Sequence, residues 1–76
     1  MKEMSRMRVG EWGKVLGMEL EPELERRLRE LGLCEGAELC CVGESPLGDP
    51  RAYRVSGAVI ALRQRDAAHI IIKGRV

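Results

Sequence analysis

The sequence predicts a small, mainly β protein: a barrel of about five short strands, with one early α-helix at about residues 22–31 packed against it. Three observations lead to this fold class. A helical stretch stops sharply at Gly32, and a two-residue turn signature, Ser56-Gly57, separates two short apolar segments. The chain of 76 residues has room for one small core only, and with one Trp, one Tyr and no Phe that core must be aliphatic.

The helix has signals at both ends. Pro22 suits the first helical position, where its fixed φ and missing N–H cost nothing. Gly32 suits the left-handed position after the last turn, which lets Leu33 fold back on Leu28 in a Schellman motif. We therefore expect a positive φ at Gly32. The apolar face, expected to lie in the core, consists of Leu24, Leu28 and Leu31.

Short segments with strand character make up most of the remaining chain. Residues 7–17 contain three glycines and predict a strongly curved strand. Further strands are predicted at 37–43, 51–55, 58–62 and 69–73, with about one and a half helical turns at 63–68. Regularly spaced hairpins favour a partly open barrel of the SH3-like or OB-like kind over a sandwich, with the helix covering one end.

The first six residues are charged and lack an apolar run, so we expect residues 1–6 to be a flexible segment and 7–76 to form a single domain. The longest apolar stretches fall far short of the ~20 residues that span a bilayer, which predicts no direct membrane insertion. Charge is unevenly distributed. Residues 1–48 hold seven Lys or Arg against ten acids and residues 49–76 hold six against two, a split that we interpret as solvated faces.

The three cysteines are an odd number and two of them are adjacent, which predicts a reducing, cytoplasmic setting without a disulfide framework. Cys34, Cys40, Cys41 and His69 are the only thiol or imidazole metal ligands. Neighbouring strand residues point to opposite faces, so Cys40 and Cys41 do not easily meet one ion, and we expect buried thiols rather than a metal site. A redox or metal role for Cys34, Cys40 or Cys41 stays open.

Other chemistry is poorly supported by the residues. No nucleophile and base are recognisably arranged, so we expect no enzyme and no bound cofactor. Two aromatic residues are too few for the stacking platforms of a nucleic-acid site, and we expect no nucleic-acid partner.

The segment 44–50 has the Pro, Gly and Asp chemistry of an exposed loop, and it allows two interpretations. In the structural one, Pro46 and Gly48 set the loop shape and Asp49 caps a turn. In the functional one, Leu47 is solvent-exposed at the tip and inserts into a partner or into a second copy of the chain.

Three spaced motifs carry a resemblance to a known family. They are Arg27-Leu28-x-x-Leu31-Gly32-Leu33-x-x-Gly36, then Ser45-Pro46-Leu47-Gly48-Asp49-Pro50, then Gly57-x-x-Ile60-Ala61-Leu62-Arg63-x-x-x-Ala67-x-x-Ile70. Over about residues 7–73 the chain resembles the ferrous iron transport protein A (FeoA) family and the similar SH3-like domain of iron-dependent repressors. It departs from the family at Glu35, where a proline is usual and where the glutamate should loosen the turn, and at the Cys40-Cys41 pair.

The resemblance implies a small cytoplasmic accessory protein of bacterial ferrous iron uptake that contacts the cytoplasmic domain of the GTPase-linked ferrous iron permease. The alternative is a regulatory interaction domain acting on a metal-responsive transcription factor. A homo-oligomer is possible in either case, because a small barrel exposes strand edges. The candidate partner-contact residues are Leu33, Pro46, Leu47, Gly48 and Asp49.

Overall fold

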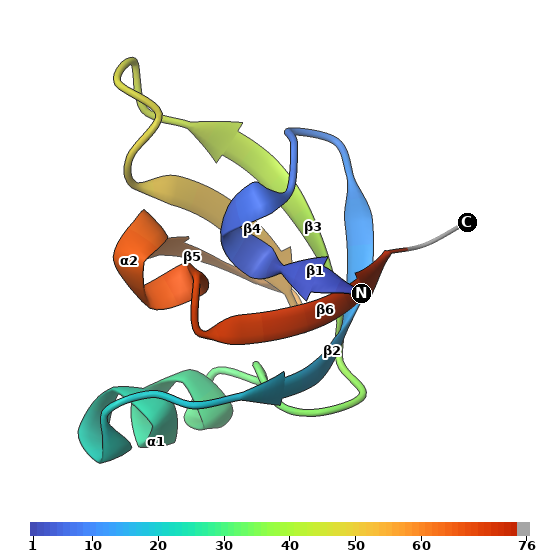
Figure 1. The fold of residues 1–76 in the computed structure, drawn as a ribbon, viewed down its shortest axis with the longest axis vertical. Coiled ribbons are helices and arrows are strands. Elements are labelled where there is room, and N and C mark those ends of the chain that lie inside the picture. The colour runs from blue at the N-terminus through green and yellow to red at the C-terminus, as the bar shows by residue number, and fades with distance from the viewer. Residues whose placement is uncertain (75–76) are drawn as a thin grey trace.

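A computed structural model describes residues 1–74. Its six strands form one antiparallel sheet in the order β1-β6-β2-β3-β4-β5 (Figure 1). The strands are β1 (Lys2–Glu3), β2 (Trp12–Met18), β3 (Glu38–Glu44), β4 (Arg51–Val55), β5 (Ala58–Leu62) and β6 (Ile70–Gly74). The helices are the 3₁₀ turn η1 (Met4–Arg6), α1 (Pro22–Glu30) and α2 (Gln64–Ala67). The predicted class, mainly β with one early helix, is confirmed, with six strands instead of about five.

The sheet curls into a barrel that stays open between its edge strands, β1 and β5, which are not paired with each other. The turns η1 and α2 lie together at this opening, where the Gln64 side-chain amide donates to the Ser5 carbonyl at 2.8 Å. Two local irregularities sharpen the curvature, one between Val15 and Gly17 and one between Cys41 and Gly43. The sheet is therefore a partly open barrel, as predicted, and the two short turns cover its opening.

The hairpin between β4 and β5 has the predicted two-residue turn. Ser56 has φ +50° and Gly57 has φ +80°, the positive values that a type I′ turn requires. Val55 pairs with Ala58 directly across it, so the turn fixes the register of the whole hairpin. Alternate residues of β4 and β5 then point inward, and the innermost aromatic side chain, Tyr53, is fully buried.

The helix α1 ends as predicted. Gly32 has φ +99°, its N–H donates to the Arg29 carbonyl at 3.0 Å, and the Leu33 N–H reaches back to the Leu28 carbonyl at 2.9 Å. These two bonds are those of a Schellman motif. They bring Leu33 into the core, where it is completely buried.

The helix is less deeply packed than the leucine spacing predicts. Leu28 is buried and Leu24 is partly buried, but Leu31 is 46% exposed, so its predicted place in the core is wrong. The physical reason is that the core at this end is small and Leu33, returned by the Schellman motif, occupies it. Leu31 then stands at the helix cap, on the solvent side of the turn.

The expectation of a flexible segment at residues 1–6 is also wrong. Lys2 and Glu3 pair with Ile72 and Ile71 of β6, and the following turn buries Met4 completely, as it does Met7. The charged residues around these methionines hid their burial from the sequence pattern. Their flexible thioether chains suit an irregular gap in an otherwise largely aliphatic core.

Candidate functional site

The loop between β3 and β4, residues 45–50, projects from the barrel at the end away from α1 (Figure 1). Its backbone is internally bonded, since the Gly48 N–H donates to the Ser45 carbonyl at 2.8 Å and the Ser45 N–H to the Pro50 carbonyl at 3.1 Å. At its tip Leu47 is 94% exposed, which confirms the expected exposure. A large aliphatic side chain is thus presented to solvent on a tied loop.

The base of the loop is fastened to α2 by Asp49. One carboxylate oxygen of Asp49 accepts the backbone N–H of Gln64 at 2.9 Å. Gln64 is the first residue of α2, and the residue before it, Arg63, supplies no side-chain cap. Asp49 therefore caps a helix 15 residues further along the chain, where the sequence suggested a cap within its own turn.

A polar network continues from this point into the opening of the barrel. The Gln64 side chain bonds Ser5, and the Tyr53 hydroxyl donates to the Met4 carbonyl at 3.4 Å. Burial of the phenol raises the pKa of Tyr53 to about 12, so it stays a protonated donor at neutral pH. The position of the loop is therefore linked to the closure of the barrel.

The structure separates the predicted contact residues into three groups. Pro46 and Leu47 are exposed at the loop tip, while Gly48 and Asp49 shape and anchor the loop. Leu33 lies in the core with no exposed surface, so its assignment as a partner-contact residue is wrong. Its apolar character serves the Schellman turn instead.

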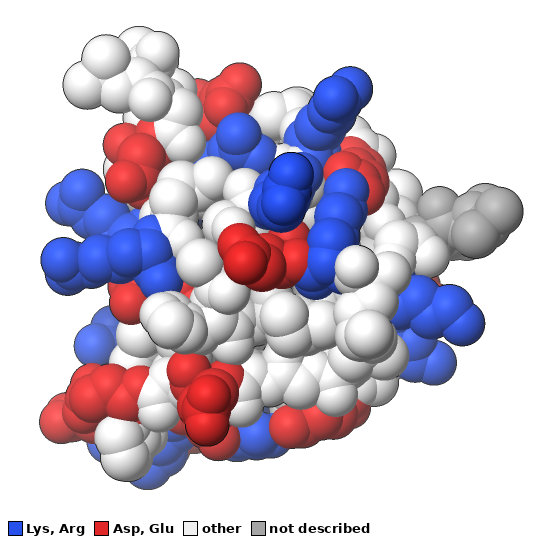
Figure 2. Space-filling model, viewed as in Figure 1, with Lys and Arg blue, Asp and Glu red and all other residues white. Residues whose placement is uncertain are grey.

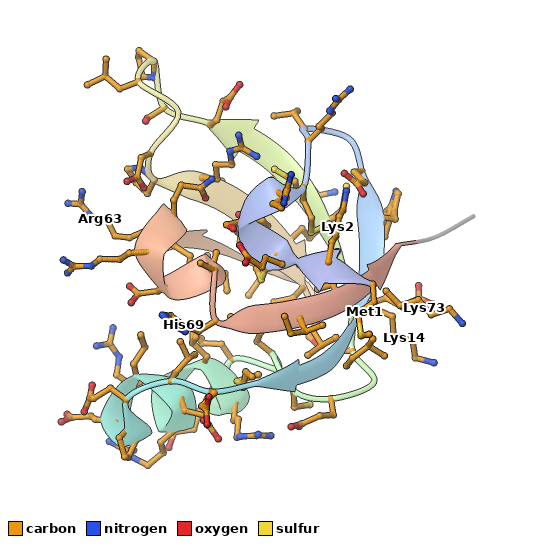
Figure 3. The ribbon with its side chains drawn as sticks, in the orientation of Figure 1. Met1, Lys2, Lys14, Arg63, His69 and Lys73 are labelled. Carbon is orange, nitrogen blue, oxygen red and sulfur yellow. The ribbon has the colours of Figure 1, made fainter. Side chains whose placement is uncertain are left out.

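The sequence did not indicate that the segment before β2 lies beside this loop. The Arg51 guanidinium donates to the Met7 carbonyl, and the Gly10 N–H donates to the Cys41 carbonyl at 2.7 Å. These bonds hold Val9, 53% exposed, at the same end of the barrel as Leu47. Figure 2 shows Lys and Arg side chains over η1 and α2, and Figure 3 shows Arg63 pointing outward beside α2. The basic excess of residues 49–76 indicated those on α2, whereas those near η1 lie in the half of the sequence that is richer in acids.

At the opposite end, α1 is fixed by ion pairs. Arg29 donates to both carboxylate oxygens of Glu35 at 2.7 and 2.9 Å and to Glu25 at 3.1 Å. Hydrogen bonding from Arg29 lowers the pKa of Glu35 to about 2. Glu35 was expected to loosen the turn before β3, and it is instead tied to the last turn of α1.

The three cysteines lie away from this loop tip, and Cys40 and Cys41 lie on opposite faces of the sheet. Cys41 belongs to the core and Cys40 is buried on the other face of β3, while Cys34 is half-buried near the end of α1. Burial raises the pKa of the Cys41 thiol, which keeps it protonated and unreactive at neutral pH. Within residues 1–74 no three His, Cys, Asp or Glu side chains gather in a way that could hold a metal ion.

Comparison with known proteins places the chain in a family. The model of the FeoA domain matches residues 2–74. The chain belongs to the FeoA family. The solution structure of the FeoA protein from Chlorobium tepidum is 31% identical, with a TM-score of 0.93 over 97% of this chain and 70% of that one. Iron(II) transport protein A from Clostridium thermocellum is 30% identical, with a TM-score of 0.87 over 95% of this chain and 44% of that one.

Two further comparisons extend the fold likeness of this FeoA-family chain. FeoA from Stenotrophomonas maltophilia, solved with zinc and described as a prokaryotic SH3 domain protein, is 26% identical, with a TM-score of 0.81 over 96% of this chain and 91% of that one. A manganese-dependent transcriptional repressor shares the fold at 18% identity, with a TM-score of 0.84 over 97% of this chain and 36% of the repressor. No curated protein matches the chain by sequence. In residues 1–74, no helix has the length and apolar character needed to cross a bilayer.

Proposed function

We propose that this protein is a small cytoplasmic accessory protein of bacterial ferrous iron uptake that acts by direct contact on the cytoplasmic domain of the GTPase-linked ferrous iron permease. Membership of the FeoA family supports the link to ferrous iron transport. The observation that carries the contact proposal is the 94% exposure of Leu47 on a loop that is bonded to itself and to α2.

Because hydrogen bonds already hold the loop in one conformation, Leu47 can bind a partner at a low entropic cost. Burying an exposed Leu side chain contributes about 1.5–3 kcal/mol, and little loop entropy is lost on binding because the loop is already ordered. Pro46 lies beside Leu47 and is also exposed, so it belongs to the same contact. Gly48 and Asp49 hold the loop in place for binding.

The test is a pull-down of this protein by the permease's cytoplasmic domain, with and without guanine nucleotide. We expect binding by the unmodified protein and a loss of at least roughly tenfold in affinity for Leu47→Asp, because a charge is desolvated at the contact. Leu31→Asp is the matched control, since Leu31 is exposed at the other end of the barrel. Thermal melts should show that both variants stay folded.

Absence of binding in both nucleotide states would contradict the proposal. Equal binding by the unmodified protein and Leu47→Asp would show that the contact surface lies elsewhere than on the loop. The alternative function, a regulatory domain for a metal-responsive transcription factor, has no observation of its own in its favour. The likeness to the manganese-dependent repressor, at 18% identity, concerns the fold alone.

A further inference from the structure

The charges of this molecule are separated along its length. Residues 19–38, which include α1, carry seven Glu against three Arg. The rest of residues 1–74 carries nine Lys or Arg against five Asp or Glu. The α1 end is therefore acidic, and the rest of the molecule, which includes the Leu47 end, carries an excess of positive charge. Figure 2 shows basic side chains, with acidic ones among them, over η1 and α2.

Four exposed arginines lie on the turns next to the Leu47 loop, and we call them the arginine rim: Arg6, Arg8, Arg63 and Arg65. Arg6 ends η1 and Arg8 follows Met7, whose carbonyl is bonded by Arg51 at the start of β4. On the other side of the opening, Arg63 and Arg65 flank Gln64, whose N–H is held by Asp49 of the loop. The hydrogen bonds thus hold both pairs at the loop end.

The rim arginines make no ion pair within residues 1–74, although acidic groups are present at this end. Three of those acids already have partners. Glu44 pairs with Arg51 at 3.5 Å, Glu11 with Lys2 at 2.5 Å, and Asp49 accepts the Gln64 N–H. Residues 4–10, 43–51 and 63–68, which meet at this end, carry five Arg against Glu44, Asp49 and Asp66, so a small excess of positive charge surrounds the exposed leucine.

We propose that the arginine rim docks on a carboxylate-rich face of a protein partner, with Leu47 seated in an apolar recess within that face. This inference rests on the proposed function and adds the chemistry of the partner surface. Guanidinium groups pair with carboxylates in a planar, two-bond geometry, and arginine is enriched at protein interfaces. A lipid surface fits less well, because membrane-surface segments combine their basic residues with aromatic anchors, and residues 4–10, 45–50 and 63–68 contain no Trp, Tyr or Phe.

The first experiment measures affinity for the permease's cytoplasmic domain at 50, about 150 and about 500 mM NaCl, a range over which screening of exposed charges becomes strong. The variants are Arg6→Gln with Arg8→Gln, and Arg63→Gln with Arg65→Gln. Each pair should weaken binding by roughly 2- to 30-fold at low salt and flatten its salt dependence. Arg27→Gln, which removes one exposed positive charge from α1, is the control and should not weaken binding.

A second experiment does not depend on the permease. Retention on immobilised poly-L-glutamate at low salt should be greater for the unmodified protein than for the variant lacking all four rim arginines, and Arg27→Gln should resemble the unmodified protein. If the permease domain does not bind but poly-L-glutamate retains the protein through the rim, the proposed function fails and the acidic-partner inference stands.

Three results overturn the inference itself. One is permease binding that rim neutralisation and salt leave unchanged. Another is equal retention on poly-L-glutamate with and without the rim. The third is rim-dependent binding to phosphatidylglycerol–phosphatidylcholine vesicles with none to poly-L-glutamate or the permease domain, which assigns the rim to a lipid surface.

Discussion

Each end of the barrel carries an exposed leucine, but the two ends are built differently. At the loop end, Leu47 is 94% exposed on a loop bonded to α2, and the neighbouring opening is filled by the buried Met4 and Met7. At the α1 end, Leu31 is 46% exposed on a helix held by one buried leucine, its Schellman motif and surface ion pairs. A helical leucine stripe therefore does not by itself create a core that buries all of its leucines.

The largest expected effect concerns the loop end. Met4→Ala should lower the free energy of unfolding by about 2–5 kcal/mol, because a fully buried side chain is replaced by a cavity at the barrel opening. Chemical denaturation measures this. Met1→Ala is the control, since Met1 is 90% exposed and should change stability by less than about 0.5 kcal/mol. Similar small effects of both would mean that the N-terminal segment is not part of the core.

Leucines of α1 should differ strongly from one another. Leu28→Ala should cost about 2–5 kcal/mol because Leu28 is 5% exposed, whereas Leu31→Ala should cost less than about 0.5 kcal/mol. Thermal or denaturant melts of the two variants give the comparison directly. A loss for Leu31→Ala as large as that for Leu28→Ala would show that the helix packs more deeply than described.

A smaller loss is expected at the end of α1. In Gly32→Ala the new Cβ would lie 2.5 Å from the Ser56 hydroxyl oxygen, and φ +99° is itself unfavourable for alanine, so the variant should lose roughly 1–3 kcal/mol. Gly36→Ala separates the two causes, since Gly36 has φ +90° but nothing within 4 Å of a Cβ. If both variants lose the same stability, the contact with the β4–β5 turn is unimportant.

The smallest effect is a dependence on pH. The pKa of Glu35, lowered to about 2 by Arg29, means that its ionised form favours the folded state. That contribution is complete above the ordinary pKa of about 4.5 and is lost as the pH falls towards 2. Glu35→Gln should therefore be slightly less stable than the unmodified protein at pH 7, and the difference should vanish near pH 2. A difference that persists at pH 2 points to packing instead of charge.

Local chemistry made part of this molecule predictable from its sequence. The positive φ of Gly32, the Ser56-Gly57 turn and the exposure of Leu47 each follow from a few neighbouring residues, and each is confirmed. Burial of Met4 depends on an opening formed by strands far along the chain, so no local pattern could reveal it.

In the candidate site too, the sequence predicted what neighbouring residues determine and missed what depends on distant residues. Pro46 to Asp49 form one loop and were found together, whereas the fastening of Asp49 to Gln64 joins residues 15 apart and the link from Arg51 to Met7 joins residues 44 apart. The rim arginines approach the loop only through these contacts. The basic excess of residues 49–76 was a trace of Arg63 and Arg65, but Arg6 and Arg8 lie in the half that is richer in acids and left no such signal.

The comparison between the two ends is tested most directly by NMR. The isotope-labelled protein is titrated with the unlabelled cytoplasmic domain of the permease, and backbone amide shifts are followed. We expect the changes to gather at residues 45–50, 6–9 and 63–65 and to leave residues 22–31 unaffected. Changes confined to residues 22–31, with the loop end unperturbed, would contradict the assignment of the contact surface to the Leu47 end.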